Sequence, residues 1–424
     1  MRIALRLPDK LHIKSKTVLL YLIMFFSGDT YLFGTNSSDG MVTLSRYLLI
    51  PVCVFLFMRW ALKRDKREGN NRKLASYLII IIAFVLCSVM NHDSTNYIII
   101  KILIITAALL LTLNYTVDEY ITSFCESVYF IAVCSVILEI IAYVLPALVY
   151  SLPSIVGTGR AVTKSCLLAG VLEDYLGTIA VRASGIFWEP GVFTIYLNLA
   201  IAFELFYKAQ INKKYLIVEV LAMAFTFSTT GYIVFAWQLL CYGLFGRRET
   251  DSRSKNSNRV LFVFVVAVFL SLIVFSTNIS DVVFAKFTYI GGGSARKASV
   301  IINLQMALAH PIIGIGNDLA MHDEFVYLVA RSPYIHGVAN DNTNTLLYLF
   351  AAYGIPFGML FTIGTYRFGE WISRGRKRVT IIFFSIIVLL YIGENLKLST
   401  LPFVITFFGY QWSRHQNNLS SQYS

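Results

Sequence analysis

Two long polar stretches of this sequence hold charged residues whose types suit phosphate binding and proton transfer. In the later stretch, Arg296 follows the glycine triplet at 291–293. A guanidinium presents a planar fork of donors that matches phosphate oxygens, so Arg296 is a candidate phosphate ligand. His336 lies further on, close to a polar cluster that includes Asp341 and Asn344. A histidine in such a setting could take a proton from a sugar hydroxyl.

The earlier stretch ends in Arg182-Ala-Ser-Gly-Ile-Phe-Trp-Glu189-Pro-Gly, directly before an apolar run. Proline is favoured in the first turn of a helix, so Pro190 predicts a helix start with Glu189 at its N-terminus. The helix dipole favours an anion there. The alternative to a functional pair is a capped helix start with Arg182 as a lipid-headgroup anchor.

Other residues in these stretches have simpler interpretations. The glycine triplet is explained equally well by a flexible hinge, and His310 before Pro311 is expected to be a structural turn residue. The run His322-Asp-Glu could be part of a metal site, but no second ligand cluster with a familiar spacing supports this interpretation. Solvated loop polarity is the alternative for each of these residues.

Composition defines the elements that must position these side chains. Of the 424 residues, 57% are hydrophobic and only 14% are charged, whereas soluble domains have about 25% charged residues. The net charge of +12 could suggest nucleic acid as a partner, but the basic residues lie in short loops between apolar runs. That distribution is typical of membrane topology signals and excludes a nucleic-acid-binding surface.

The apolar residues fall into twelve runs near the length of a membrane-spanning helix. The runs cover residues 17–34, 42–60, 74–90, 97–113, 121–145, 191–208, 214–229, 230–246, 260–276, 343–366, 379–394 and 398–412. We therefore predict an all-α polytopic membrane protein with about 12 transmembrane helices in a single domain, 1–424. The positive-inside rule places both termini in the cytoplasm, because the N-terminal segment and alternate loops carry most Lys and Arg residues.

This topology leaves two large external loops, 146–190 and 277–341, where chemistry is expected. Ionisable residues within or next to the apolar runs are few, and they keep a transporter open as an alternative because such residues usually face a cavity or a partner. They are Arg46, Lys101, Glu126, Glu139, Glu204, Glu219 and Glu394. They form no obvious relay, and no internal repeat indicates a transporter built from two related halves.

In layout, the chain resembles the Wzy-type polymerases of bacterial O-antigen and capsular polysaccharide, within the superfamily that also contains O-antigen ligases. Three stretches carry the resemblance: 182–191, then Thr226-x-Ser228-Thr-Thr-Gly231, and a third from Arg296 through 310–316 to Asn344-x-x-Leu347 and Gly354. Two positions depart from the family pattern. Thr229 stands where the second motif has arginine, and Thr343 stands where ligase-like members have histidine.

The resemblance implies a GT-C-like fold in the bacterial inner membrane, two large periplasmic loops, and lipid-linked substrates. Repeat units on undecaprenyl pyrophosphate would be the partners, together with membrane lipids, and a chain-length regulator is left open. An acceptor sugar hydroxyl would attack the anomeric carbon of the donor chain. This scheme requires no nucleotide sugar or dissociable cofactor, and the family is not generally considered metal-dependent, so the resemblance implies no metal or other cofactor.

Residue roles follow from the same resemblance. The expected catalytic residues are Glu189 or His336 as the base and Arg296 as a pyrophosphate ligand. The expected substrate-binding residues are Arg160, Arg182, Asp341 and Asn344. An O-antigen ligase and a polysaccharide flippase or other transporter remain the alternative functions.

Overall fold

The computed structural model describes residues 9–32, 39–62, 70–156, 162–173, 181–245, 292–317, 319–330 and 344–411. Most of them lie in helices. The helices are α1 (Asp9–Phe25), α2 (Asp39–Leu62), α3 (Asn70–Met90), α4 (Thr95–Asn114), α5 (Val117–Val144), α6 (Pro146–Tyr150), α7 (Pro190–Phe206), α8 (Lys213–Phe225), α9 (Thr229–Phe245), α12 (Gly292–Ala309), α13 (Leu319–Ala330), α14 (Thr345–Ile372), α15 (Lys377–Gly393) and α16 (Leu401–Gln411).

Four of the described helices, α3, α4, α5 and α14, are long and apolar enough to cross a membrane. Shorter apolar helices include α7, α9 and α16. Eleven of the twelve predicted runs overlap one of the helices above, and the run 260–276 lies outside the described residues. The prediction of a mostly helical membrane protein is therefore confirmed at this coarser level.

The predicted end of the first apolar run, at residue 34, is wrong. Helix α1 ends at Phe25, and Thr30 forms an isolated bridge with Phe187 instead. The Ser27 hydroxyl donates to the Met24 carbonyl, 2.7 Å away. Short polar side chains offer the backbone such local bonds in place of the helical ladder, which favours a helix end.

The first large loop contains a sheet that the all-α prediction did not include. Its strands are β1 (Ser154–Val156), β2 (Val162–Ser165), β3 (Gly170–Glu173) and β4 (Arg182–Gly185). Neighbouring strands pair antiparallel in the order β1-β2-β3-β4. Strand β4 leads into α7 and also contacts α5.

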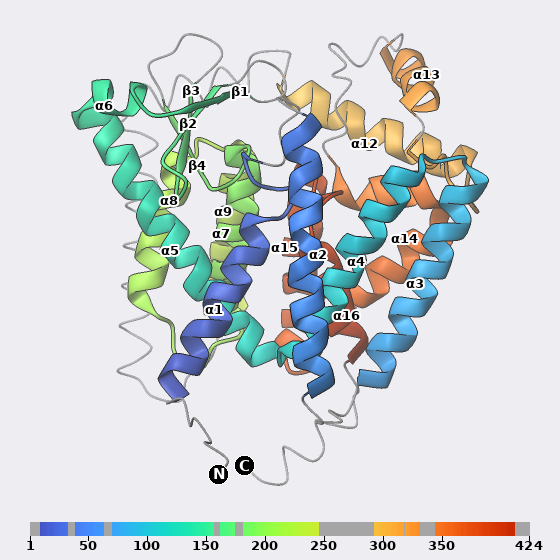
Figure 1. Ribbon diagram of the computed structural model, residues 1–424, viewed down its shortest axis with the longest axis horizontal. Coiled ribbons are helices and arrows are strands. Elements are labelled where there is room, and N and C mark those ends of the chain that lie inside the picture. Colours follow the sequence, from blue (N-terminus) through green and yellow to red (C-terminus); the bar gives the residue numbers. More distant parts are fainter. Residues whose placement is uncertain are drawn as a thin grey trace.

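The molecule has two distinct ends. Figure 1 shows the sheet, α6, α12 and α13 along its upper edge, which we call the sheet end, and the first turns of α1 at its lower edge. At the lower edge, called the opposite end, the Lys73 ammonium of α3 donates to the Thr112 carbonyl of α4. The same ammonium lies 5.1 Å from the centroid of the Phe408 ring in α16.

Helix α7 runs through the core of the bundle, and every one of its residues is buried. A helix that is apolar on all sides belongs in the interior of a protein. Its polar Asn198 side chain is satisfied there, because it donates to the carbonyls of Thr194 and Gly231 at 2.9 and 3.2 Å. Helix α7 therefore fixes the position of its own N-terminus, which carries Glu189, relative to the rest of the fold.

Candidate active site

The segment between β4 and α7 is held by backbone contacts with the turn that follows α1. The Tyr31 amide donates to the Ile186 carbonyl, and the Trp188 amide donates to the Asp29 carbonyl, both at 3.1 Å. Helix α7 then begins at Pro190 with Glu189 as its N-cap residue, as the sequence predicts. The Glu189 side chain makes no capping hydrogen bond.

Arg182, at the start of β4, joins the first motif stretch to the second. Its Nε donates to the Thr226 carbonyl at 3.1 Å, and its Nη2 donates to the Phe227 carbonyl at 3.4 Å. Both carbonyls belong to the turn between α8 and α9. An arginine has five N–H donors, so these two bonds leave others for a ligand.

The polar residues of the second motif shape that turn. The Thr226 hydroxyl donates to the Met223 carbonyl at 2.7 Å and accepts from the Ser228 amide at 3.3 Å. The Ser228 hydroxyl accepts from the Gly231 amide at 3.3 Å. These bonds satisfy backbone groups at the end of α8 and the start of α9, so the motif has a structural role beside any chemical one.

Glu394, in the segment between α15 and α16, lies against the first turn of α7. Its side chain is 3% exposed, and a Cβ atom added to Gly191 would collide with its carboxylate group. A carboxylate is stabilised by the partial positive charge at a helix N-terminus. Glu394 is therefore a second carboxylate at the α7 N-terminus, in addition to that of the N-cap residue Glu189.

Residues of the third motif stretch at the start of α14 contact the segment between α15 and α16 that carries Glu394. The Asn344 side chain is fully buried and accepts from the Leu347 amide at 2.8 Å, so the Asn-x-x-Leu pattern describes a helix N-cap. The Thr345 hydroxyl donates to the Glu394 carbonyl at 2.6 Å and accepts from the Leu396 amide at 2.7 Å.

The glycines of the third stretch join the end of α12 to α14. The Ile315 amide donates to the Ala351 carbonyl at 3.0 Å, and the Gly316 amide donates to the Ala352 carbonyl at 2.8 Å. Gly354 has a φ of 82°, and an added Cβ would collide with the backbone of the 310–316 turn, so glycine is required there. The His310 carbonyl accepts from the Gly314 amide within this turn at 3.0 Å.

Three of the predicted site residues, Arg182, Glu189 and Asn344, lie at the sheet end with described side chains. Arg296 lies in α12, and its side chain is outside the described residues. The remaining three predicted residues, listed here, also lie outside the described residues: Arg160, His336 and Asp341. Within the described ranges, no three His, Cys, Asp or Glu side chains are grouped as metal ligands would be.

Sequence reasoning noted Glu394 and Lys101 as charged residues in apolar surroundings, without giving either a role, and it gave none to Lys397. The structure brings the segment that contains Glu394 and Lys397 to the starts of α4, α7 and α14. The available signal was the cost of burying a charge, which predicts a partner or a cavity but not its identity.

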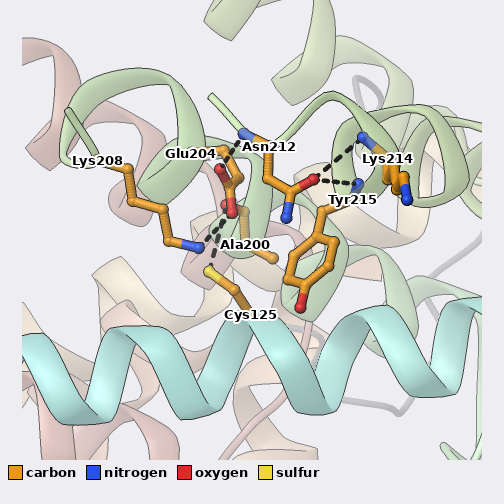
Figure 2. A network of polar contacts seen from close by, with 7 residues as sticks. All are labelled: Cys125, Ala200, Glu204, Lys208, Asn212, Lys214 and Tyr215. Atoms are coloured by element: carbon orange, nitrogen blue, oxygen red, sulfur yellow. Dashed lines mark hydrogen bonds and ion pairs between the residues drawn. The ribbon is translucent and has the colours of Figure 1, made fainter. Parts of the chain in front are cut away.

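A second polar network lies at the opposite end of the bundle, around the α7–α8 connection. Figure 2 shows Lys208 reaching Glu204, whose carboxylate also accepts from the Asn212 amide at 3.0 Å. The Asn212 side chain in turn accepts from the amides of Lys214 and Tyr215 and so caps α8. These contacts join groups of the short connection, and the Cys125 thiol of α5 donates to the Ala200 carbonyl beside them, which indicates a structural role.

Comparison with known protein families gives no match for this chain, and comparison with curated proteins gives none either. Its composition and its long apolar helices define the class as a mostly helical membrane protein.

Proposed function

We propose that this protein is a Wzy-type polymerase that joins undecaprenyl-pyrophosphate-linked repeat units into O-antigen or capsular polysaccharide. One observation carries the proposal: the three motif stretches are far apart in sequence but linked at one end of the bundle. Arg182 bonds the turn of the second stretch, and Thr345 of the third bonds the Glu394 segment. That segment contacts Gly191 of the first stretch.

The proposed topology has twelve membrane crossings with both termini in the cytoplasm and the sheet end in the periplasm. The sheet and α6 belong to the loop 146–190, while α12 and α13 belong to the loop 277–341. Their presence along one edge in Figure 1 supports a shared periplasmic location for both loops. A lipid-linked substrate in the outer leaflet would present its pyrophosphate at this edge.

The proposed reaction forms one glycosidic bond and breaks one bond to phosphate. The acceptor hydroxyl oxygen attacks the anomeric carbon of the donor chain, a base takes the hydroxyl proton, and undecaprenyl pyrophosphate leaves with the bonding electrons. Negative charge grows on the leaving group, so preorganised cations at that position would lower the barrier. Arg296 and the remaining donors of Arg182 are the proposed cations.

Glu189 and His336 are the proposed alternatives for the base. The Glu189 side chain is half-buried beside the first turn of α7 and is not used as a cap, which supports its availability for a substrate hydroxyl. Asp341, Asn344 and Arg160 would orient sugar or phosphate groups.

A gene deletion in the source bacterium tests the proposal, because each candidate function gives a different surface glycan. Loss of a polymerase should leave surface glycans with single repeat units, and the intact gene supplied in trans should restore long chains. Complete loss of surface glycan would instead indicate a ligase or a flippase. Unchanged chain length would exclude all three functions.

A further inference from the structure

Helix α12 has apolar residues on two faces, although it belongs to a loop that the proposed topology places outside the membrane. On one face, Ala298, Ile302 and Met306 pack against the 310–316 turn, α13 and α14. On the other face, Leu304 and Leu308 lie one helical turn apart and are 44% and 74% exposed. The outer face of a surface helix in water is usually polar, so this second face requires an apolar partner.

The turn after α12 extends this exposed face toward a membrane-length helix. Ile312 is 73% exposed, and the carbonyl of its neighbour Pro311 accepts from the Ile355 amide of α14 at 2.7 Å. Ile355 itself is 36% exposed, and Met359, one turn further along α14, is 46% exposed. The exposed apolar residues of α12 and its turn therefore adjoin the exposed apolar surface of α14.

Helix α3 sets the depth of the turn. The Asn91 side chain, directly after α3, donates to the Ile313 carbonyl at 3.4 Å. One turn earlier in α3, the Cys87 thiol donates to the Tyr353 carbonyl of α14 at 3.3 Å. Helix α3 is long and apolar enough to cross a membrane, and its last residue, Met90, is 59% exposed. At a rise of 1.5 Å per residue, the turn lies within about 5 Å of the end of this spanning helix.

We infer that an apolar face formed by Leu304, Leu308 and Ile312 inserts among the acyl chains of the leaflet at the sheet end. Interfacial helices bury an apolar face about 5–10 Å into the boundary between headgroups and acyl chains, which agrees with the depth set by α3. In Figure 1, α12 slopes along the upper edge toward the connection between α3 and α4. Lipid chains that surround α3 and α14 at this level would also cover the exposed face.

This inference changes the boundary of the second large loop. Part of the segment 277–341 would lie in the membrane interface and not in the aqueous compartment. The inference requires only that the protein spans a membrane, so it goes beyond the proposed polymerase function and does not rest on it.

Fluorescence quenching of the full-length chain in nanodiscs tests the position of this face. A genetically encoded fluorescent amino acid replaces Leu308 or Ile312, one at a time. The quenchers are phosphatidylcholine brominated on its acyl chains and, in a separate experiment, aqueous iodide. We expect the brominated lipid to quench both labels at least about twofold more than a label at Gln305, and iodide to quench them less.

Gln305 is the matched control because it is polar and exposed on the same helix. Ile82 of α3, which is 57% exposed within a membrane-length helix, gives the value for full lipid contact. All labelled positions are exposed, so each labelled chain should keep the wild-type melting temperature. The label at Ile312, in a turn, decides the question if the label at Leu308 prevents folding.

Two results would overturn the inference. Iodide quenching at Leu308 and Ile312 as strong as at Gln305 would place the face in water. Protection from both quenchers would mean that protein covers it, and crosslinking between differently tagged copies would show whether a second copy does so. Neither result bears on the deletion strain, since single repeat units there would still support a polymerase.

Discussion

The two ends of the bundle use charge in different ways. At the opposite end, two lysines pair with acidic groups: Lys208 pairs with the buried Glu204, and Lys16 pairs with Glu119 at 2.5 Å. Lys73 at that end donates to a backbone carbonyl. At the sheet end, Arg182 bonds carbonyl groups and the buried Lys101 lies next to Lys397. Lys208 and Lys16 therefore have acidic partners, whereas Arg182 contacts backbone carbonyls and keeps further N–H donors for a ligand.

The same difference appears in what the contacts join. The network in Figure 2 connects the end of α7 to the start of α8, and it also includes Cys125 of α5, whose thiol donates to the Ala200 carbonyl. The contacts at the sheet end join segments that are far apart in the sequence, such as Glu394 with Gly191, and Lys101 with Lys397, which are 296 residues apart. Because the sheet-end contacts join the three motif stretches of the proposed site, a substitution there should change function more than stability, and one at the opposite end should do the reverse.

The largest expected effect on function is that of Arg182→Ala. It leaves the Thr226 and Phe227 carbonyls without their donor and removes a cation from the proposed leaving-group site. We expect long glycan chains to fall about a hundredfold at normal protein level, as for other losses of preorganised charge. Gel electrophoresis of surface glycan, normalised by immunoblot, measures the effect, and Arg182→Lys should restore only part of it.

Arg376 is the matched control at the opposite end, because its Nε donates to the Ser373 carbonyl at 3.1 Å in the turn before α15. Arg376→Ala should leave chain length unchanged. Equal losses in the two variants would mean that arginine–carbonyl bonds matter only for folding. Full glycan ladders in Arg182→Ala would remove Arg182 from the proposed site.

Much of the fold follows from local sequence signals. Apolar runs predict the helices, and Pro190 and Asn344 mark helix starts through rules that involve only neighbouring residues. The sheet was not predicted, because strands of 3 or 4 residues are too short to show a clear alternation of apolar and polar residues.

The long-range contacts of the candidate site could not be read from the sequence. Nothing local to Arg182 specifies a bond to a turn that lies 44 residues away. In the same way, the apolar run before Glu394 does not predict that the Glu394 side chain contacts the first turn of α7. Motif order placed the right stretches at one end of the bundle, but packing decides which side chains meet there.

Lys208→Met tests the opposite end and should affect stability first. It leaves the Glu204 carboxylate, which is fully buried, without its cation, whereas Glu204→Gln leaves a lysine that is partly exposed to solvent. We expect Lys208→Met to lower the free energy of unfolding by about 2–4 kcal/mol and Glu204→Gln by less. Unfolding of the purified protein in mixed micelles measures both, and chain length per folded molecule should not change.

If Lys208→Met shortened the glycan chains while the protein stayed fully folded, the division between the two ends would be wrong. If Glu204→Gln instead lowered the free energy of unfolding more than Lys208→Met does, the Glu204 carboxylate would have to reach solvent or bind a proton in the folded state.

Asp29 gives the sheet end a dependence on pH. Burial raises the pKa of Asp29 to about 6, although bonds from Ser399, Tyr196 and Ser27 lower it. The folded protein then holds a proton that the unfolded chain releases near its ordinary pKa, 3.8. The contribution of the protonated Asp29 to the free energy of unfolding is therefore fully present below about pH 4 and is lost as the pH rises through about 6.

The expected loss is about 1–3 kcal/mol between pH 4 and pH 7. Asp29→Asn keeps an acceptor for the Tyr196 hydroxyl, which lies 2.6 Å from the Asp29 carboxylate, but cannot titrate. Unfolding measured across this range should therefore show a shallower slope for Asp29→Asn than for the wild type. Identical slopes would assign the pH dependence to another group.

The smallest expected effects are those of alanine substitutions at two glycines, Gly191 at the sheet end and Gly409 in α16. An alanine Cβ at Gly191 would meet the end of the Glu394 side chain, which can move, whereas one at Gly409 would meet the Gly364 backbone, which cannot. We expect Gly191→Ala to keep its melting temperature and to lower polymer yield about fivefold, because Glu394 is displaced from the α7 N-terminus. Gly409→Ala should lower stability by about 1–3 kcal/mol and leave chain length per folded molecule unchanged. If Gly191→Ala lost stability but kept full polymer yield, the contact between Glu394 and α7 would be a packing contact like that at Gly409, and the sheet end would owe its function to its cations alone.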